Sequence, residues 1–370
     1  MSLVLLNILL FSFVIQLLIY TGLFGQLSGK DESSSNKTVV NPSVSLVIAV
    51  KNEAVNLSAH LAHWASQDYP SLEIVLVDDH SIDDSVSIIE QAISKNNNIK
   101  IYKNRGSGKK EALSTGISAS SGIWIITTDA DCKPASDTWI SDMINARQQS
   151  DVILAYGPYM PASGFLNRFI RYETWYIAMQ YLSLAKLGLP YMGVGRNLAY
   201  KKEVFLKHGG YTDHAHIKSG DDDLFIAGLT PETKVGLNLK SFTYSVPATY
   251  LSELIQQKRR HLTTASSYPP QHQFILMSMF LSQLMFYISI VGLSISGTYL
   301  PLVLTIFVMR TTILLWVAYR KMTVLHERHL WYWAPILDPV SYTHLRAHET
   351  KANLVCRLLL EKKNSRSGRC

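Results

Sequence analysis

The chain has 370 residues, enough for one large domain or two of ordinary size. Its hydrophobic fraction is 47%, its charged fraction is 17% and its mean hydropathy is +0.09, which is more apolar than a typical soluble domain. The net charge of +7 does not indicate a nucleic-acid-binding protein, because residues 341–370 supply +5 of it. The three cysteines, Cys132, Cys356 and Cys370, form no disulfide framework and fit a reducing compartment.

The N-terminal residues have the length and composition of a membrane span. Residues 3–24 are uncharged, mostly apolar and numerous enough to cross a bilayer as a helix. No basic segment precedes this run and no small-residue cleavage site follows it, so residues 1–27 are expected to be a retained anchor. Residues 28–43 are polar and Ser-rich, which predicts a linker.

A second apolar region lies near the other end of the chain, where residues 262–309 contain no Lys, Arg, Asp or Glu. Residues 271–320 are predicted to form two membrane helices, 274–296 and 302–319, separated by a turn at Gly297 and Pro301. Buried core helices of a soluble protein are the alternative, which the length of the uncharged run disfavours. Arg310 lies inside the second span and needs a partner.

Basic residues flank the apolar runs, and this pattern predicts that both ends of the helix pair face the cytoplasm. Lys30 gives the same orientation for the end of the first helix. The flanking residues of the pair are Lys258, Arg259, Arg260, Arg320 and Lys321.

The character of the chain changes after a membrane-proximal segment at residues 321–340. Residues 341–370 are basic, lack membrane periodicity and resemble a translated sequencing adapter. We expect them to be an artefact, with the natural sequence diverging after about Asp338. His344 and His348 stand at helical spacing, but a metal site in such a segment is disfavoured.

The middle of the chain, residues 44–270, is predicted to be one α/β domain. Apolar runs typical of strands alternate with helical patterns, which indicates a mainly parallel sheet with helices on both faces. Asp83 and Asp84 are expected to cap a helix. Residues 165–187 form an aromatic-rich helix that packs on the sheet or lies at the membrane surface. The expected strands are 44–50, 73–77, 99–102, 123–128 and 152–157, and the expected helices are 54–66, 83–94, 109–119 and 136–148.

Three of these strands end in acidic or polar residues, namely at Glu53, at Asp78 and Asp79, and at Asp129 and Asp131. The carboxyl ends of parallel strands meet at one edge of a sheet, where ligands bind. Alternate residues of an extended segment point to the same side, so Asp129 and Asp131 should reach one ligand. Gathered carboxylates need a cation, and Mg²⁺ or Mn²⁺ carrying phosphates is the usual solution. The sequence therefore predicts an enzyme that holds a nucleoside diphosphate through a metal.

Seven motifs follow one another along the chain, at residues 51–53, 77–81, 108–113 with Gly116, 128–131, 193–197, 220–224 and 257–261. This succession resembles the membrane-bound branch of the inverting family 2 nucleotide-diphospho-sugar glycosyltransferases, over about residues 42–320. The resemblance implies a GT-A-like (Rossmann-like), mainly parallel α/β sheet with flanking helices and with N-terminal and C-terminal transmembrane helices.

The resemblance also implies roles on the donor side. Asp131 would bind Mg²⁺ or Mn²⁺, and Asp129 would contact the metal or the ribose. The carboxylate of Asp79 would accept a hydrogen bond from a uracil N3–H, and Arg260 would hold the diphosphate through its bidentate guanidinium. The full set of expected nucleotide contacts is Lys51, Glu53, Asp78, Asp79, Lys109, Asp129 and Arg260.

On the acceptor side the resemblance implies a general base at Asp221 or Asp222, and the sequence leaves the choice open. Gly220 stands where the family usually has Glu. His261 stands where it usually has Trp, which weakens any expectation of processive polymer synthesis. The expected acceptor-side residues are Gly195, Asn197, Asp223, Gln257 and His261.

The expected function is transfer of a sugar from a nucleotide-diphosphate sugar, most simply a UDP-sugar, to a lipid-linked or envelope glycan acceptor, with no nucleic-acid partner. The enzyme is expected in the cytoplasmic (inner) membrane with its catalytic domain in the cytoplasm. A sugar-phosphate nucleotidyltransferase would need a Gly-rich basic loop that residues 50–53 lack. A non-catalytic membrane scaffold would not need the acidic set.

Overall fold

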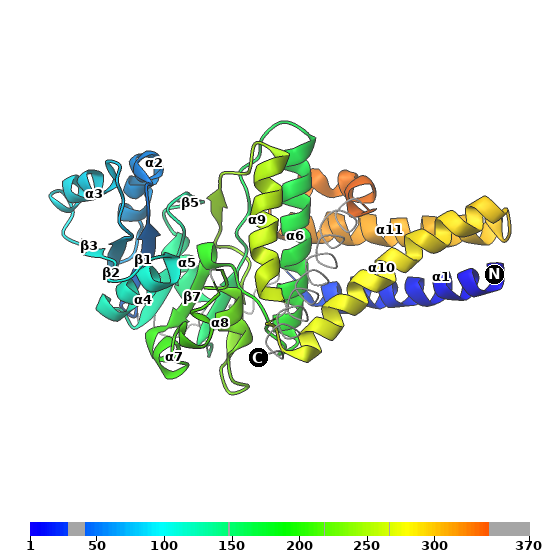
Figure 1. Cartoon of the computed structure of the whole chain (residues 1–370), viewed down its shortest axis with the longest axis horizontal. Helices are drawn as coiled ribbons and strands as arrows, with labels where there is room; N and C mark the ends of the chain where they lie inside the picture. The colour runs from blue at the N-terminus through cyan, green and yellow to red at the C-terminus, as the bar shows by residue number, and fades with distance from the viewer. Residues whose placement is uncertain (29–40, 147–148, 218, 266, 340–370) are drawn as a thin grey trace, which may run out of the picture.

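The computed structural model describes residues 1–28, 41–146, 149–217, 219–265 and 267–339. A domain built on a mixed sheet occupies one end of the molecule, and three long helices extend from it to the N-terminus (Figure 1). Two upright helices, α6 and α9, stand side by side between these parts. Most of the predicted linker, Lys30 and the whole of residues 341–370, with His344 and His348, lie outside the described residues.

The described helices and strands follow the predicted alternation. The helices are α1 (Ser2–Leu17), α2 (Ala54–Ala65), α3 (Ser85–Ile93), α4 (Lys109–Ala119), α5 (Trp139–Asn145), α6 (Phe165–Lys186), α7 (Lys202–Lys207), α8 (Asp223–Ala227), α9 (Leu251–Ala265), α10 (Pro270–Ser296) and α11 (Leu300–Val324). The strands are β1 (Val44–Val50), β2 (Leu72–Asp78), β3 (Ile99–Lys103), β4 (Trp124–Thr127), β5 (Cys132–Pro134), β6 (Val152–Ala155), β7 (Leu198–Lys201), β8 (Val235–Asn238) and β9 (Thr243–Ser245). Short π and 3-10 turns are η1 (Leu18–Leu23), η2 (Phe24–Gln26), η3 (Gly195–Asn197), η4 (Thr212–His214) and η5 (Arg328–Trp333).

The main sheet confirms the predicted fold class. Its seven strands run in the order β3-β2-β1-β4-β7-β6-β8, and only the pairs that β7 makes are antiparallel. The small second sheet pairs β5 with β9. Strands β1, β2 and β4 are mutually parallel, so their acidic carboxyl ends share one edge, as the sequence predicted.

Each face of the sheet is covered by helices, because β1 and β2 are apolar on both sides. Val47, Val75 and Val77 pack toward α4 and α6, while Leu46 and Ile74 pack toward α2 and α5. Parallel strands buried on both faces are typical of α/β proteins. A Cβ added at Gly116 would meet a methyl group of Val47 at 2.6 Å and one of Val77 at 2.8 Å, so this glycine lets α4 lie close to the sheet.

Some boundaries differ from the predictions. The helix expected at 136–148 is shorter, at Trp139–Asn145, and the strand expected at 152–157 ends at Ala155, before Gly157 and Pro158. Asp83 accepts hydrogen bonds from Ser85 and from the backbone N–H of Ala54, whereas Asp84 occupies the N-cap position of α3 without a side-chain bond. Thus Asp83 alone fills the expected capping role through its side chain.

Among the described residues, three helices are long and apolar enough to cross a membrane: Ser2–Gln26, Pro270–Ser296 and Leu300–Val324. The predicted N-terminal and C-terminal membrane helices are thereby confirmed as structural elements. The last turns of the first one are π and 3-10 rather than α, and Gly22 and Gly25, which favour the α-helix weakly, lie there. Gly297 ends α10 with a left-handed φ of +66°, as expected of a turn.

Helices α6 and α9 connect the sheet domain to the membrane helices. The buried side of α6 packs in the same core as the sheet, which confirms one of the two positions expected for residues 165–187. Lys258 of α9 pairs with the buried Glu173 of α6 at 2.7 Å. Gln257 donates to the hydroxyl of Tyr159 at 2.8 Å, so α9 is held on the domain by polar side chains as well.

Arg310, predicted to need a partner, pairs with Asp338 at 2.6 Å, and both side chains are almost fully buried. The Asp338 carboxylate also accepts from Tyr287 of α10 at 2.8 Å and from Tyr172 of α6 at 3.2 Å. Arg310 donates in addition to Gln16 of α1 at 2.8 Å. One buried ion pair therefore joins all three membrane helices to the domain helix α6.

We expect Asp338→Ala to lower the midpoint of thermal unfolding in detergent strongly, because it leaves the Arg310 guanidinium buried without a counter-charge. Breaking a buried pair from one side costs about 3–5 kcal/mol. The double variant Arg310→Met/Asp338→Leu removes both charges and should recover most of the loss. Equal losses in the single and double variants would contradict this account.

Candidate active site

The edge of the sheet at which β1, β2 and β4 end carries most of the predicted site residues. Lys51, directly after β1, pairs with Asp79, directly after β2, at 2.9 Å. Asp79 is only 3% exposed and also accepts from Asn104 at 2.6 Å and from the backbone N–H of Gly108 at 2.9 Å. Burial alone would raise the pKa of Asp79, but the hydrogen bonds from Lys51 and Asn104 outweigh it and keep the pKa below its usual value. A nucleobase N–H would have to share this carboxylate with those donors.

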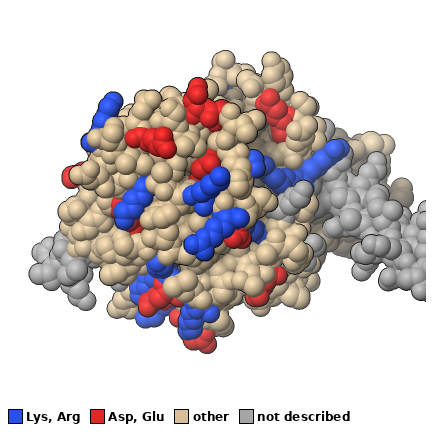
Figure 2. All heavy atoms as spheres, turned by 60° about the vertical axis from the view of Figure 1, so that its left-hand side comes forward, with Lys and Arg blue, Asp and Glu red and all other residues tan. Residues whose placement is uncertain are grey.

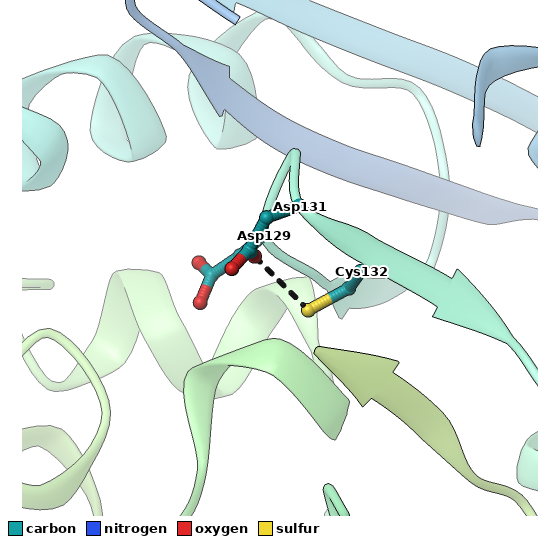
Figure 3. Close-up of side chains that lie close together, drawn as sticks. All are labelled: Asp129, Asp131 and Cys132. Atoms are coloured by element: carbon teal, nitrogen blue, oxygen red, sulfur yellow. Dashed lines mark hydrogen bonds between the residues drawn. The ribbon is translucent and has the colours of Figure 1, made fainter. Parts of the chain in front are cut away.

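Asp129 and Asp131 lie in the turn between β4 and β5 rather than in the extended segment that the sequence suggested. The backbone N–H of Cys132 donates to the carbonyl of Asp129 at 3.0 Å and closes this turn. The two carboxylates nevertheless lie close together, with the Cys132 thiol beside them, as Figure 3 shows. The turn, not strand periodicity, brings the pair together.

This group fits a hard divalent cation held by carboxylates. One ligand atom each from Asp129, Asp131 and Cys132 lie within 4.8 Å of one another. Burial and then the charge of Asp129 raise the pKa of Asp131, so a cation would relieve a real repulsion. Burial raises the pKa of the Cys132 thiol far above its usual range, and Sγ donates to Asp131 at 3.3 Å. The thiol therefore supports Asp131, and oxygen ligands remain for Mg²⁺ or Mn²⁺.

Lys109, the first residue of α4, joins the two acidic clusters. Its Nζ lies 2.8 Å from Oδ1 of Asp129 and 2.8 Å from Oδ2 of Asp221. Partial burial opposes the charge, but Asp129 and Asp221 raise the pKa of Lys109 well above its usual value, so the ammonium is permanent. The side chain is 41% exposed and can still reach a ligand.

Asp221, Asp222 and Asp223, called the acidic trio here, lie at the start of α8. Their side chains have different environments. The Lys109 charge, working against burial, holds the pKa of Asp221 below its usual value. Burial and then the charges of Asp221 and Asp223 raise the pKa of Asp222 to about 7. Asp222 accepts from the backbone N–H of Gly195 at 2.6 Å and from that of Asp223 at 2.9 Å. Asp221 is thus a fixed anion, whereas Asp222 has the pKa of a general base.

Two glycines shape this trio. Gly220 has a φ of +89°, and an added Cβ would meet Leu224 at 2.7 Å, which explains why this chain has no Glu there. A Cβ at Gly195 would lie 3.3 Å from carboxylate atoms of both Asp221 and Asp222. The sequence suggested that the glycines of residues 193–197 let the backbone approach another group closely. At Gly195 the backbone does approach the carboxylates of Asp221 and Asp222.

Asn197 has a structural role instead of the predicted acceptor contact. Its side chain is fully buried. It accepts from the indole N–H of Trp139 at 3.0 Å and donates to the carbonyls of Tyr156 at 2.7 Å and Ser241 at 2.8 Å. Both amide protons and one lone pair of the oxygen are thus used within the protein, which gives this buried side chain a structural role.

The remaining predicted residues are placed as follows. Glu53 is half-buried and bonded to Asn56 at 2.6 Å, and burial raises its pKa, with Asp131 and Asp129 adding to the effect. Asp78 accepts from the backbone N–H of Ser81 at 3.0 Å. Arg260 is exposed, and no contact recorded among the described residues links it to the acids. The side chain of His261 lies outside the described part of the chain.

Two basic residues with roles in this region were missed by the sequence analysis. Lys110 donates to the backbone carbonyls of His214 at 2.8 Å and Ile217 at 2.9 Å and so holds the loop that leads to the trio. Arg196 is bound to the carbonyl of Gly157 and lies 4.7 Å from the ring of Tyr159, and its own carbonyl accepts from Thr128 next to the acidic turn. Neither contact has a sequence signal, because the partners are backbone atoms of distant segments.

Comparison with known proteins shows which family this domain is similar to. Residues 45–209 match the sequence model of the family described as Glycosyl transferase family 2. This part of the chain is therefore similar to the family that the motifs resemble, which supports that resemblance. A solved mannosyltransferase, PcManGT from Pyrobaculum calidifontis in complex with GDP-Man and Mn²⁺, has the same fold, with a TM-score of 0.56 and 18% identity over 90% of this chain and 97% of its own.

Curated relatives are similar in sequence to part of the chain. An uncharacterized glycosyltransferase of Haemophilus influenzae is 27% identical over 119 residues, which cover 32% of this chain and 47% of the relative. The undecaprenyl-phosphate 4-deoxy-4-formamido-L-arabinose transferase of Proteus mirabilis is 33% identical over 115 residues, which cover 30% and 35%. The matched part thus spans less than half of either relative's length.

The different environments of Asp221 and Asp222 predict a pH dependence of the transfer reaction proposed below. Only the carboxylate form of Asp222 can accept a proton, so kcat/KM should fall as the pH falls through about 7. Asp221→Asn removes a negative neighbour that raises the Asp222 pKa. The pH at which kcat/KM falls should therefore move lower, with activity retained. Asp222→Asn should lose about 10²-fold to 10⁴-fold in kcat. The opposite pattern, with Asp221→Asn inactive and Asp222→Asn active, would make Asp221 the base.

Proposed function

We propose that this protein transfers a sugar from a nucleotide-diphosphate sugar to a hydroxyl or phosphate oxygen of a lipid-linked acceptor, with inversion at the anomeric carbon. The observation that carries the proposal is the meeting of two acidic motifs, distant in sequence, around one lysine. Asp129 and Asp221 both lie 2.8 Å from Lys109. The similarity of residues 45–209 to the family supports the same class of reaction.

On the donor side, Asp131 and Asp129 would hold Mg²⁺ or Mn²⁺. A bound cation would neutralise the charge that develops on the leaving diphosphate. Lys109 adds a permanent positive charge between the donor-side acids and the trio, where it can contact a phosphate oxygen. Arg260 is an exposed cation on α9, and we keep it as a proposed phosphate contact that becomes engaged when the donor binds.

On the acceptor side, Asp222 acts as general base and takes the proton of an attacking hydroxyl; an acceptor phosphate needs no such step. The oxygen forms a bond to the anomeric carbon while the bond from that carbon to the diphosphate breaks, so the configuration inverts. The Gly195 N–H holds one Asp222 oxygen at 2.6 Å and fixes the direction of the carboxylate. Asp221 stays bound to Lys109 and keeps the charge balance of the site.

The proposed acceptor follows from the membrane helices and from two relatives. Three candidate spans lie in one chain with the domain, so an acceptor in the bilayer would be close to the site. Two relatives carry lipid acceptors in their names, an undecaprenyl-phosphate transferase and a cholesterol galactosyltransferase of Borreliella burgdorferi. The basic flanks of the spans favour a domain on the cytoplasmic side of the inner membrane. A UDP-sugar remains the proposed donor.

The domain surface fits a small-molecule donor better than a nucleic acid. Figure 2 shows one face of the molecule, where Lys and Arg alternate with Asp and Glu. Over the described residues of that face no continuous basic surface is visible, whereas nucleic-acid binding uses one. We therefore propose the nucleotide sugar, the lipid-linked acceptor and the membrane as the partners.

We expect Asp131→Ala to abolish metal-dependent binding of nucleotide, because it removes an oxygen ligand from the donor site. Isothermal titration of the detergent-purified protein with UDP or GDP, with and without Mn²⁺, measures this directly. Asp84→Ala is the matched control, since Asp84 is an exposed acid whose side chain makes no cap bond. Unchanged binding in Asp131→Ala, or no metal-dependent binding by the wild-type protein, would contradict the proposed function.

A further inference from the structure

We propose that Asp223 is a positioning residue that fixes the membrane-entry segment to the catalytic acids, rather than a residue that contacts the acceptor. This inference rests on the function proposed above. The membrane-entry segment is defined here as the described residues from the end of α9 to the first turn of α10, namely 264–265 and 267–272. It connects the trio at the start of α8 with the helix that enters the bilayer.

The hydrogen bonds of Asp223 leave little capacity for a substrate. Its Oδ1 accepts from the backbone N–H of Leu224 at 2.8 Å. Its Oδ2 accepts from the hydroxyl of Thr264 at 2.5 Å and from that of Tyr268 at 2.7 Å. Asp223 is 6% exposed and Thr264 is 1% exposed. Both oxygens therefore serve the protein, and one of them joins two residues of the membrane-entry segment.

Aromatic packing continues this connection into α10. The ring of Tyr268 makes an edge contact with the ring of the buried Tyr191, with 5.6 Å between centroids. Tyr191 stacks on His272, in the first turn of α10, at 5.8 Å. Pro269, the N-cap of α10, and Pro270, its first residue, follow Tyr268 and restrict the backbone there. The start of the membrane helix is thus held by stiff contacts that lead back to Asp223.

The other end of α9 is held differently. Gln257 contacts Tyr159, and Lys258 pairs with Glu173 on α6. Those contacts place α9 against the domain, but neither involves the trio. The bonds from Thr264 and Tyr268 to Asp223, in contrast, bind the membrane-entry segment directly to the neighbour of the candidate base Asp222.

This arrangement has a consequence for catalysis. An acceptor group carried by a lipid sits at a depth set by the bilayer, so its distance from the bound donor sugar depends on how the domain is held to α10. Water, the competing acceptor, reaches the site without regard to that geometry. Loosening the connection should therefore impair transfer to a lipid acceptor while hydrolysis of the donor continues.

The test compares Asp223→Ala with Thr264→Val/Tyr268→Phe, which removes both hydroxyls and leaves the carboxylate in place. The matched control is Thr263→Val/Tyr250→Phe, since Thr263 is exposed and bonds only its own helix at the Arg260 carbonyl, and Tyr250 is 69% exposed. Each full-length protein is purified in detergent and placed in lipid nanodiscs. Nucleotide release is measured with Mn²⁺ and a UDP- or GDP-sugar, with and without polyprenyl phosphate as the lipid acceptor probe.

We expect Asp223→Ala and the double variant to raise KM for the lipid acceptor about tenfold, within the usual range for coupled sites. In the double variant, which keeps the Asp223 charge beside Asp222, donor hydrolysis and the affinity for nucleotide with Mn²⁺ should remain within about twofold of the control. Because the double variant retains Asp223, it tests the inference even if Asp223→Ala fails to fold.

Two results would overturn the inference. A double variant that matches the control while Asp223→Ala is inactive would show that Asp223 acts directly on a substrate. Equal losses of hydrolysis and lipid transfer in both variants would show a general effect on folding. A wild-type protein that binds nucleotide with Mn²⁺ but releases none would instead contradict the proposed function, on which the inference depends.

Discussion

The ammonium group of Lys109 between Asp129 and Asp221 is the interaction on which the rest of the site depends. Without it, carboxylates from β4 and α8 would face one another in a partly buried space, where like charges are costly. The lysine is placed there by the start of α4. The N–H of Gly108 is bound to Asp79 at the end of β2, and Gly116 lets the same helix lie close to β1 and β2. The position of one charge thus follows from the packing of one helix on a parallel sheet.

A second constraint joins the domain to the bilayer. The pair Arg310–Asp338 binds groups from three membrane helices and from α6, and Asp223 accepts from two hydroxyls of the segment that leads into α10. The two aspartates bind different elements. Together they show that buried charged groups connect the domain to the helices. The hydrogen bonds of such groups are more sensitive to displacement than apolar contacts are.

The sequence was sufficient for the features that local patterns encode. The apolar runs that end in Asp79 and Asp129 identified the sheet, its parallel strands and its functional edge, and α4 was bounded correctly because Gly108 and the helical pattern mark it. Uncharged length identified the membrane helices, since few other structures use such runs.

The features that the sequence analysis did not predict depend on tertiary contacts. Asn197 has the appearance of a substrate-binding amide, and only the folded structure shows that Trp139, Tyr156 and Ser241 occupy it. The partner of Arg310 lies beyond the last membrane helix, where no periodicity indicates it. Lys110 and Arg196 bind backbone carbonyls of other segments, and a carbonyl carries no residue-specific signal. The choice between Asp221 and Asp222 required the positions of Lys109 and Gly195.

The buried thiol of Cys132, beside Asp129 and Asp131, is a natural reporter of local opening of the domain. Cys132 is fully enclosed where β5 pairs with β9, and a thiol reacts with alkylating reagents only as an exposed thiolate. In a version of the protein with Cys356 and Cys370 replaced, the alkylation rate would therefore measure how often this corner of the domain opens in the native state. Any ligand that stiffens the corner would slow the modification, so occupancy could be followed without a labelled sugar or a turnover assay.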